Sequence, residues 1–209
     1  FRKRLFQWKY FPGDMVVENF FPISKSIHST EYMPEVKENV AITDAANNII
    51  SHQYIDQLKT ETDLEKLTIP HIINDRDTDK KNVEIAQEIL GDILPVKLRG
   101  YYLYYAPWDQ IPRLRGVSNV FYDMMDRPEF THKIIQRFTE IQLSIMEQYE
   151  EQGLLDYDLA DLHCTPPYTS DLPAKDYDGG KVRLKDIWIR SMAQMFSSIS
   201  PAQHEEFDL

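Results

Sequence analysis

The most regular pattern of apolar positions in the chain lies in residues 128–152. Apolar side chains recur there every three or four residues, as they do on one face of an α-helix. They are Phe130, Ile134, Phe138, Ile141, Ile145 and Tyr149. Pro128 suits a first helical position, and Gly153 follows the last periodic residue. The segment is therefore predicted to be a long helix whose apolar stripe packs into the core.

Shorter patterns predict further helices. Residues 79–91 carry a helical apolar face and end at Gly91, which suits the left-handed C-terminal position. GVSNVFYDMM predicts a helix or helical turn just before the long helix. A weaker stripe indicates helix in residues 51–60, followed by a brief helical turn that Pro70 ends.

Between these helices lie apolar or aromatic runs that favour strands. They are residues 15–23, 39–43, 96–105, 154–162 and 186–196. Strands and helices alternate, and the connections are long enough for crossovers, so parallel pairing is expected. The sequence thus predicts an α/β fold in one domain that spans residues 1–209.

Composition narrows the function classes. The chain is 42% hydrophobic, enough to bury a core, and its net charge of −11 disfavours a nucleic-acid-binding surface. A single cysteine, Cys164, excludes an internal disulfide, which predicts a reducing, cytoplasmic location. No run approaches the roughly 18 apolar residues of a membrane helix. Because the chain opens on Phe1 and stops just inside a predicted helix, we expect it to be part of a longer protein.

Ligands of parallel α/β folds bind where strands end, so the residues after each strand are the candidates for a site. The run YYLYYAPWD delivers Trp108 and the candidate catalytic residue Asp109, and Arg113 follows it. Aromatic side chains beside a guanidinium suit a flat or carboxylated ligand. The alternative is a buried aromatic strand beside a solvated acid and surface arginines.

Two further strand ends carry candidates. His163, with Tyr168 near it, follows residues 154–162 and could transfer protons near neutral pH, or serve only as a hydrogen-bonded structural residue. In residues 186–196, alternation places Arg190 and Gln194 on one face. A buried guanidinium there implies an acid or a bound anion, and the alternative is an exposed sheet edge. No metal site is predicted, because the chain has one thiol and scattered imidazoles.

Three segments resemble, in chain order, elements of the uroporphyrinogen decarboxylase superfamily. They are TDLEKLTIP, VSNVFYDMMDRPEFTHKIIQRFTE and AQMFSSISPAQHEEFDL. The resemblance covers about residues 55–209 and implies a TIM-type (β/α)8 barrel with its site at the C-terminal mouth. A whole barrel takes roughly 250 residues, so this chain would be a partial barrel with parallel strands, the N-terminal to middle part of a longer chain.

The resemblance implies two kinds of enzyme chemistry, decarboxylation of porphyrinogens without a cofactor or methyl transfer involving corrinoids. Arg2-Lys3-Arg4 does not match the Arg-Gln-x-Gly-Arg stretch of the decarboxylases, and His163-Cys164 lacks the spacer of the methyltransferases' His-x-Cys. The preferred interpretation is a corrinoid-dependent methyltransferase-like enzyme acting on an anionic small molecule. A uroporphyrinogen decarboxylase is the runner-up, and a non-catalytic barrel that binds a carrier protein is the third alternative.

The expected site residues follow from this interpretation. His163 and Asp109 are the catalytic candidates, and the substrate-binding candidates are Arg190, Gln194, Trp108, Tyr168 and Arg113. No cofactor is expected in this fragment, whereas a corrinoid or zinc is implied for the full-length protein. The expected partners are a small-molecule substrate, a corrinoid carrier protein and a second copy of the chain, with no nucleic acid and no membrane.

Overall fold

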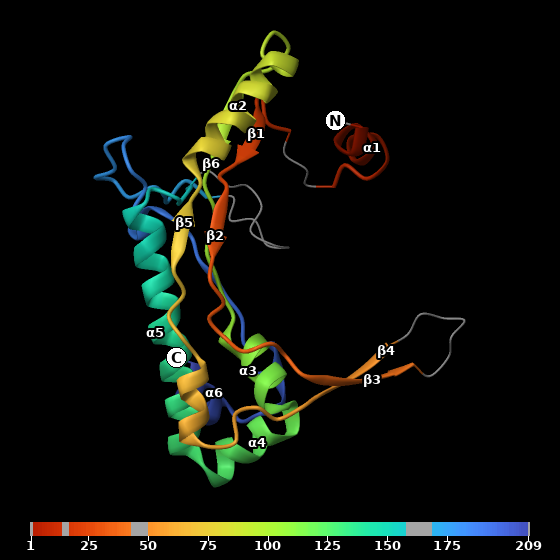
Figure 1. The fold of residues 1–209 in the computed structure, drawn as a ribbon, viewed down its shortest axis with the longest axis vertical. Helices are drawn as coiled ribbons and strands as arrows, with labels where there is room; N and C mark the ends of the chain where they lie inside the picture. The colour runs from red at the N-terminus through yellow and green to blue at the C-terminus, as the bar shows by residue number, and fades with distance from the viewer. Residues whose placement is uncertain (1, 14–16, 43–49, 158–168, 209) are drawn as a thin grey trace.

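The computed structural model describes residues 2–13, 17–42, 50–157 and 169–208, and it has a mixed α/β fold. Its longest element is the helix α5 (Pro128–Glu151), which runs along one side of the molecule (Figure 1). Phe130, Ile134, Phe138 and Ile141 are buried, so the predicted stripe packs into the core. The long helix inferred from the apolar period is confirmed.

The main hydrophobic core surrounds the N-terminal half of α5. Short helices pack there, as the lower part of Figure 1 shows. They are η1 (Glu61–Lys66), α3 (Pro107–Arg115), α4 (Val117–Asp126), η3 (Gln194–Ser198) and α6 (Pro201–Asp208). Leu58, Leu67 and Leu114 are completely buried. Each such side chain contributes roughly 1.5–3 kcal/mol of transfer free energy.

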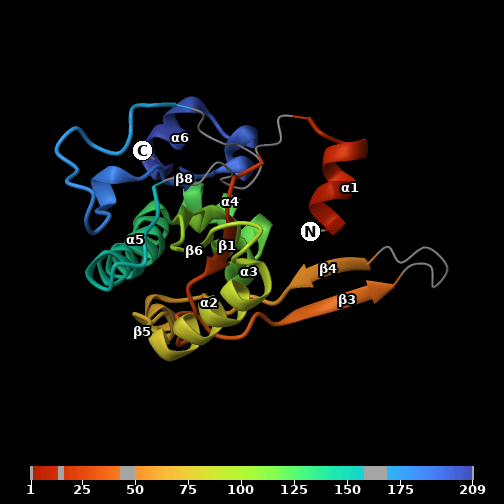
Figure 2. The ribbon, with the colours of Figure 1, turned by 90° about the horizontal axis from the view of Figure 1, so that it is seen from above.

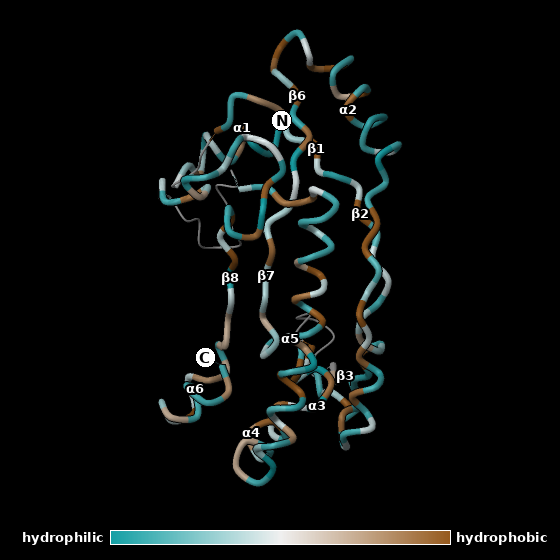
Figure 3. Tube along the Cα trace, turned by 90° about the vertical axis from the view of Figure 1, so that its left-hand side faces the viewer, coloured by the Kyte–Doolittle hydropathy of each residue, from teal (hydrophilic) through white to brown (hydrophobic). Residues whose placement is uncertain are grey.

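Parallel pairing joins strands that lie far apart in the sequence. β1 (Phe21–Ser24) pairs with β6 (Val96–Arg99), and β7 (Tyr104–Tyr105) pairs with β8 (Arg190–Ser191), which runs beside it in Figure 3. An isolated parallel bridge also joins Tyr101 to Leu155. The chain therefore leaves β7, passes through α3, α4 and α5, and returns parallel to its starting strand.

Gly100 lets these segments approach closely. A Cβ atom there would lie well inside van der Waals contact of the carbonyl oxygens of Leu154 and Leu155. The neighbouring Tyr101 backbone N–H donates to the Leu154 carbonyl at 2.8 Å, so the backbones are hydrogen-bonded at this point. The predicted strand 96–105 accordingly divides at Gly100 into β6 and β7.

The expectation that all strands pair in parallel is wrong. β2 (Ile27–Ser29) pairs antiparallel with β5 (Ile72–Asn74), and β3 (Glu38–Ile42) pairs antiparallel with β4 (Ile50–Tyr54). The described strands form pairs and no closed barrel. The predicted helix in residues 51–60 is also wrong, because five residues of β4 pair with β3. A helix here would bury few apolar side chains, which is a smaller gain than the hydrogen bonds between β3 and β4.

The predicted strand in residues 186–196 is mostly replaced by helical turns. η2 (Leu184–Asp186) precedes the two-residue β8, and η3 begins at Gln194. Phe196 is buried against the ring of Trp108, with 4.6 Å between ring centroids. The turn of η3 directs Phe196 into the core. The alternating pattern of the sequence predicted an extended strand and gave no indication of this turn.

The predicted helix 79–91 is confirmed as α2 (Arg76–Leu90), which starts earlier because Asp75 caps it. The Asp75 carboxylate accepts from the Thr78 backbone N–H at 2.9 Å. Gly91 ends this helix with right-handed backbone, not the expected left-handed conformation. The basic start of the chain forms α1 (Arg2–Tyr10), which has no buried residue and lies apart from the other elements in Figure 2.

Candidate functional site

The carboxyl end of β7 brings two predicted site residues to one aromatic ring. The hydroxyl of Tyr104 donates to Oδ2 of Asp109 at 3.1 Å. The guanidinium carbon of Arg190 lies 5.9 Å from the centroid of the same Tyr104 ring, because Arg190 is the register partner of Tyr104 in the parallel pair. A carboxylate and a guanidinium are thus both placed next to one tyrosine, where parallel strands end and ligands commonly bind.

Local sequence explains this placement. Pro107 ends β7 and occupies the first turn of α3, so Asp109 lies within one helical turn of the strand end. Both Tyr104 and Asp109 are half-buried, which leaves part of each side chain open to solvent. The arrangement can bind an anion through Arg190 and transfer a proton through Asp109.

Trp108 lies in the core and not at the open surface. Its side chain is 1% exposed, and its indole nitrogen has no hydrogen-bond partner among the described residues. The ring packs against Phe196. This position leaves no face of the indole for a substrate and fits the alternative interpretation of a buried aromatic.

Gln194 does not share a strand face with Arg190. It is exposed at the first position of η3, whereas Arg190 is half-buried in β8. The expected projection of both side chains into one enclosed space is therefore wrong, because η3 interrupts the alternation. His163 and Tyr168 lie outside the described residues.

A cavity of about 290 Å³ lies between β7 and α5. We name it the tyrosine cavity, because its lining includes five tyrosines: Tyr32, Tyr102, Tyr104, Tyr105 and Tyr149. The rest of the lining consists of Gln110, Gln142, apolar residues of α5, and Leu103, Ala106 and Pro107. Burial raises the pKa of Tyr32, Tyr105 and Tyr149, so these phenols stay protonated near neutral pH. Tyr105 is further held by a 2.7 Å hydrogen bond to Thr139.

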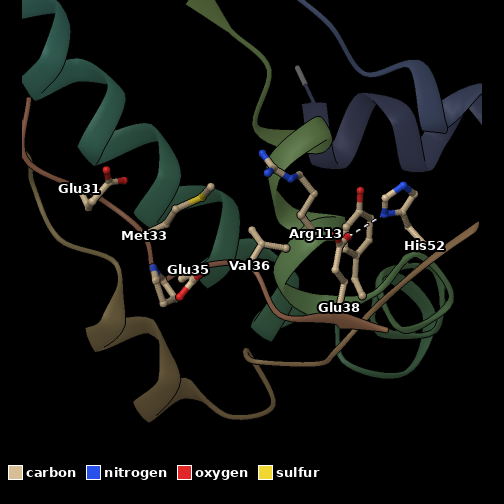
Figure 4. A pocket seen from close by; sticks show the side chains of 9 residues that line it. Glu31, Met33, Glu35, Val36, Glu38, His52 and Arg113 are labelled. Atoms are coloured by element: carbon tan, nitrogen blue, oxygen red, sulfur yellow. Dashed lines mark hydrogen bonds and ion pairs between the residues drawn. The ribbon is translucent and has the colours of Figure 1, made fainter. Parts of the chain in front are cut away.

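Arg113 lies at a second, more open depression, shown in Figure 4. We name it the acidic groove; its volume is about 690 Å³, and Glu31, Glu35 and Glu38 line it. Glu38 is paired with His52 at 3.0 Å across the β3–β4 ribbon. Arg113 instead donates through Nη1 to the side-chain oxygen of Gln110 at 2.8 Å. Arg113 therefore lines the acidic groove and is hydrogen-bonded to Gln110, which lines the tyrosine cavity.

Sequence reasoning missed Gln110 and Tyr32 as site residues. Gln110 precedes Arg113 by three positions, the spacing at which side chains meet on one helix face. That spacing is present, but no helix was predicted for this segment, which the structure shows to be α3. Tyr32 lies in a stretch without any apolar period, and no local signal indicates its contact with the cavity.

Arg115 is not a surface arginine, because it is buried in an ion-pair network. Nε donates to Oδ2 of Asp123 at 2.7 Å, and Nη1 contacts Asp56. Burial opposes the charge, but hydrogen bonds and the charges of both carboxylates outweigh it and raise the pKa of Arg115. This network stabilises the junction of α3 and α4 and leaves no donor set open to a ligand.

The described residues contain no group of three or more His, Cys, Asp or Glu side chains that could hold a metal ion. In the same part of the chain, no helix is both long and apolar enough to span a membrane. Comparisons with protein-family models, curated proteins and solved structures found no match to this chain.

Proposed function

We propose that this chain belongs to an enzyme of the uroporphyrinogen decarboxylase superfamily, similar to its corrinoid-dependent methyltransferases, that acts on an anionic small molecule. The observation that carries the proposal is the convergence of Asp109 and Arg190 on Tyr104 at a strand end. These two residues were selected from the sequence as catalytic and substrate-binding candidates. Their meeting through β7 and β8 supports a common site.

The proposal includes the finer fold, a partial (β/α)8 barrel. The parallel pairs β1–β6 and β7–β8 and the helical crossover from β7 to Leu155 support it. In such a barrel the strand ends line one mouth, to which Asp109 and Arg190 would both belong. The antiparallel ribbon β3–β4 would then be an insertion outside the barrel, consistent with its projection from the body in Figure 2.

Roles follow from the chemistry of the side chains. Arg190 binds the anionic group, because a guanidinium can donate two parallel hydrogen bonds to a carboxylate or phosphate. Asp109 accepts or returns a proton, and the hydrogen bond from Tyr104 orients its carboxylate. His163 remains a predicted second proton-transfer group. The described residues offer no zinc ligand set, so no step is assigned to a metal.

Calorimetric titration of the purified protein with methylcobalamin and with uroporphyrinogen tests the proposal. We expect methylcobalamin to bind, and Arg190→Ala to weaken binding at least about tenfold, since a charge-assisted hydrogen bond contributes roughly 1.5–3 kcal/mol. Arg4→Ala is the control, because Arg4 is exposed on α1.

The outcomes separate the candidate functions. Binding of uroporphyrinogen alone would favour the decarboxylase, and binding of neither compound would remove the enzyme proposal and leave a carrier-binding barrel. Equal affinities of the natural protein and Arg190→Ala would contradict the role of Arg190 specifically.

A further inference from the structure

Arg113 differs from Arg99 and Arg115 in its partners. Arg99 is paired with Asp156, and Arg115 with Asp123 and Asp56. Within the described residues, no ion pair joins Arg113 to a carboxylate, and its one hydrogen-bond partner is the neutral amide of Gln110. Removing a guanidinium from water is costly unless an anion compensates it. The environment of Arg113 is therefore suited to an anion that binds from solution.

The side chains beside Arg113 belong to the tyrosine cavity. Gln110 lines the cavity and accepts the hydrogen bond from Arg113. Tyr32 also lines it, and the positive charge of Arg113 opposes part of the burial-induced rise in the pKa of Tyr32. Arg113 itself lines the acidic groove, and we call the side of the cavity formed by its two neighbours, Tyr32 and Gln110, the rim.

The cavity indicates the shape of the uncharged part of a ligand. Its volume of about 290 Å³ lies at the lower end of ligand sites in proteins, which fits one ring and not a tetrapyrrole. Five tyrosines line the cavity together with Phe138, Ile141 and Ile145 of α5. Aromatic rings pack on one another with roughly 0.5–1.5 kcal/mol beyond the burial of area. A single aromatic ring is thus the best match.

The glutamates of the acidic groove favour an anion with a single negative charge at Arg113. Glu31 and Glu35 line the groove together with Arg113, as Figure 4 shows. Their negative charges repel a dianion more strongly than a monoanion. A carboxylate therefore fits this rim better than a phosphate monoester does.

We propose that the tyrosine cavity binds a single-ring aromatic carboxylate, with the ring among the tyrosines and the carboxylate on Arg113. The inference goes beyond the proposed function, because it concerns a cavity next to the Asp109–Arg190 pair and requires no methyl transfer. Tyr104 lines the cavity and also contacts that pair. The inference can therefore hold if the methyltransferase proposal fails, and fail if that proposal holds.

Calorimetric titration with benzoate, without any cobalamin present, tests this site. We expect saturable binding of benzoate, with at least about fivefold weaker binding of cyclohexanecarboxylate and at least about tenfold weaker binding of benzyl alcohol and of phenyl phosphate. The first comparison removes the aromatic ring, the second removes the charge, and the third replaces the monoanion by a dianion.

Variants assign the binding to the cavity and its rim. Arg113→Gln is expected to weaken benzoate binding at least about tenfold, and Arg113→Lys less, because an ammonium lacks the two-pronged geometry. Arg76→Gln is the matched control, since Arg76 is exposed on α2. Gln142→Trp fills the cavity with a ring and is expected to abolish binding without removing any charge. Circular dichroism establishes that each variant is folded.

The proposal is overturned if benzoate gives no saturable binding, or if cyclohexanecarboxylate binds as tightly as benzoate. It is equally overturned if folded Arg113→Gln and Gln142→Trp both keep the natural affinity. An effect of Arg190→Ala on methylcobalamin, with no binding of benzoate, would uphold the proposed function alone.

Discussion

Arg115 and Asp123 form a two-pronged ion pair that joins the last residue of α3 to the middle of α4. Nε donates to Oδ2 at 2.7 Å and Nη2 donates to Oδ1 at 3.1 Å. The exposed fractions are 8% for Arg115 and 3% for Asp123. Asp56, from the segment after β4, contacts the same guanidinium, so three parts of the chain meet at one charge.

Replacing Asp123 with Ala is expected to destabilise the protein by about 3–5 kcal/mol, because it leaves a buried guanidinium with reduced compensation. Urea denaturation followed by circular dichroism measures the loss. Asp126→Ala is the control, since Asp126 is an exposed residue of the same helix and should change the free energy of unfolding by less than about 0.5 kcal/mol. Similar losses for the two variants would contradict a special role of the buried pair.

Gly100→Ala is expected to destabilise the protein by about 1–3 kcal/mol, because the new methyl group overlaps the backbone of Leu154 and Leu155. Thermal unfolding provides the measurement. Gly180→Ala serves as the control, because its nearest neighbour is the movable carboxylate of Asp178. A Gly100→Ala protein with unchanged stability would show that the parallel contact at Tyr101 and Leu155 is not tight.

Asp186 is expected to make stability fall in acid. Hydrogen bonds from Arg183 lower the pKa of Asp186 to about 2, against the opposing effect of burial. In the unfolded chain an aspartate titrates near about 3.9. Its contribution is therefore complete above about pH 4 and is lost as the pH falls toward about 2.

Comparison with Asp186→Asn isolates this group. The variant should be less stable at neutral pH, and its free energy of unfolding should fall less than that of the natural protein between about pH 4 and pH 2. Denaturant titrations at several pH values measure both slopes. Asp178→Asn is the control, because Asp178 is exposed. Parallel slopes for the natural protein and Asp186→Asn would contradict the prediction.

The sequence made Asp109 and Arg190 site candidates by their places after or within predicted strands, and the structure places both next to Tyr104. The sequence did not identify Tyr104 as their common neighbour, because the pairing of β7 with β8 joins residues more than 80 positions apart. It placed Trp108 in a substrate site, although the ring of Phe196 buries it. An aromatic residue after a strand has the same local pattern in both situations.

The helices that bury a periodic stripe, above all α5, were determined by the sequence itself, because spacing of three or four residues, proline and glycine act within a few positions of one another. Tertiary structure alone decided β4, the turn of η3, the burial of Arg115 and the closeness of Arg113 to the tyrosine cavity. Each depends on a partner distant in the chain. β4 pairs with β3, and η3 packs Phe196 on the ring of Trp108. Arg115 pairs with the carboxylate of Asp56, and the charge of Arg113 acts on Tyr32 of the cavity. Such contacts gain free energy only after the chain has closed long loops, so no local pattern records them.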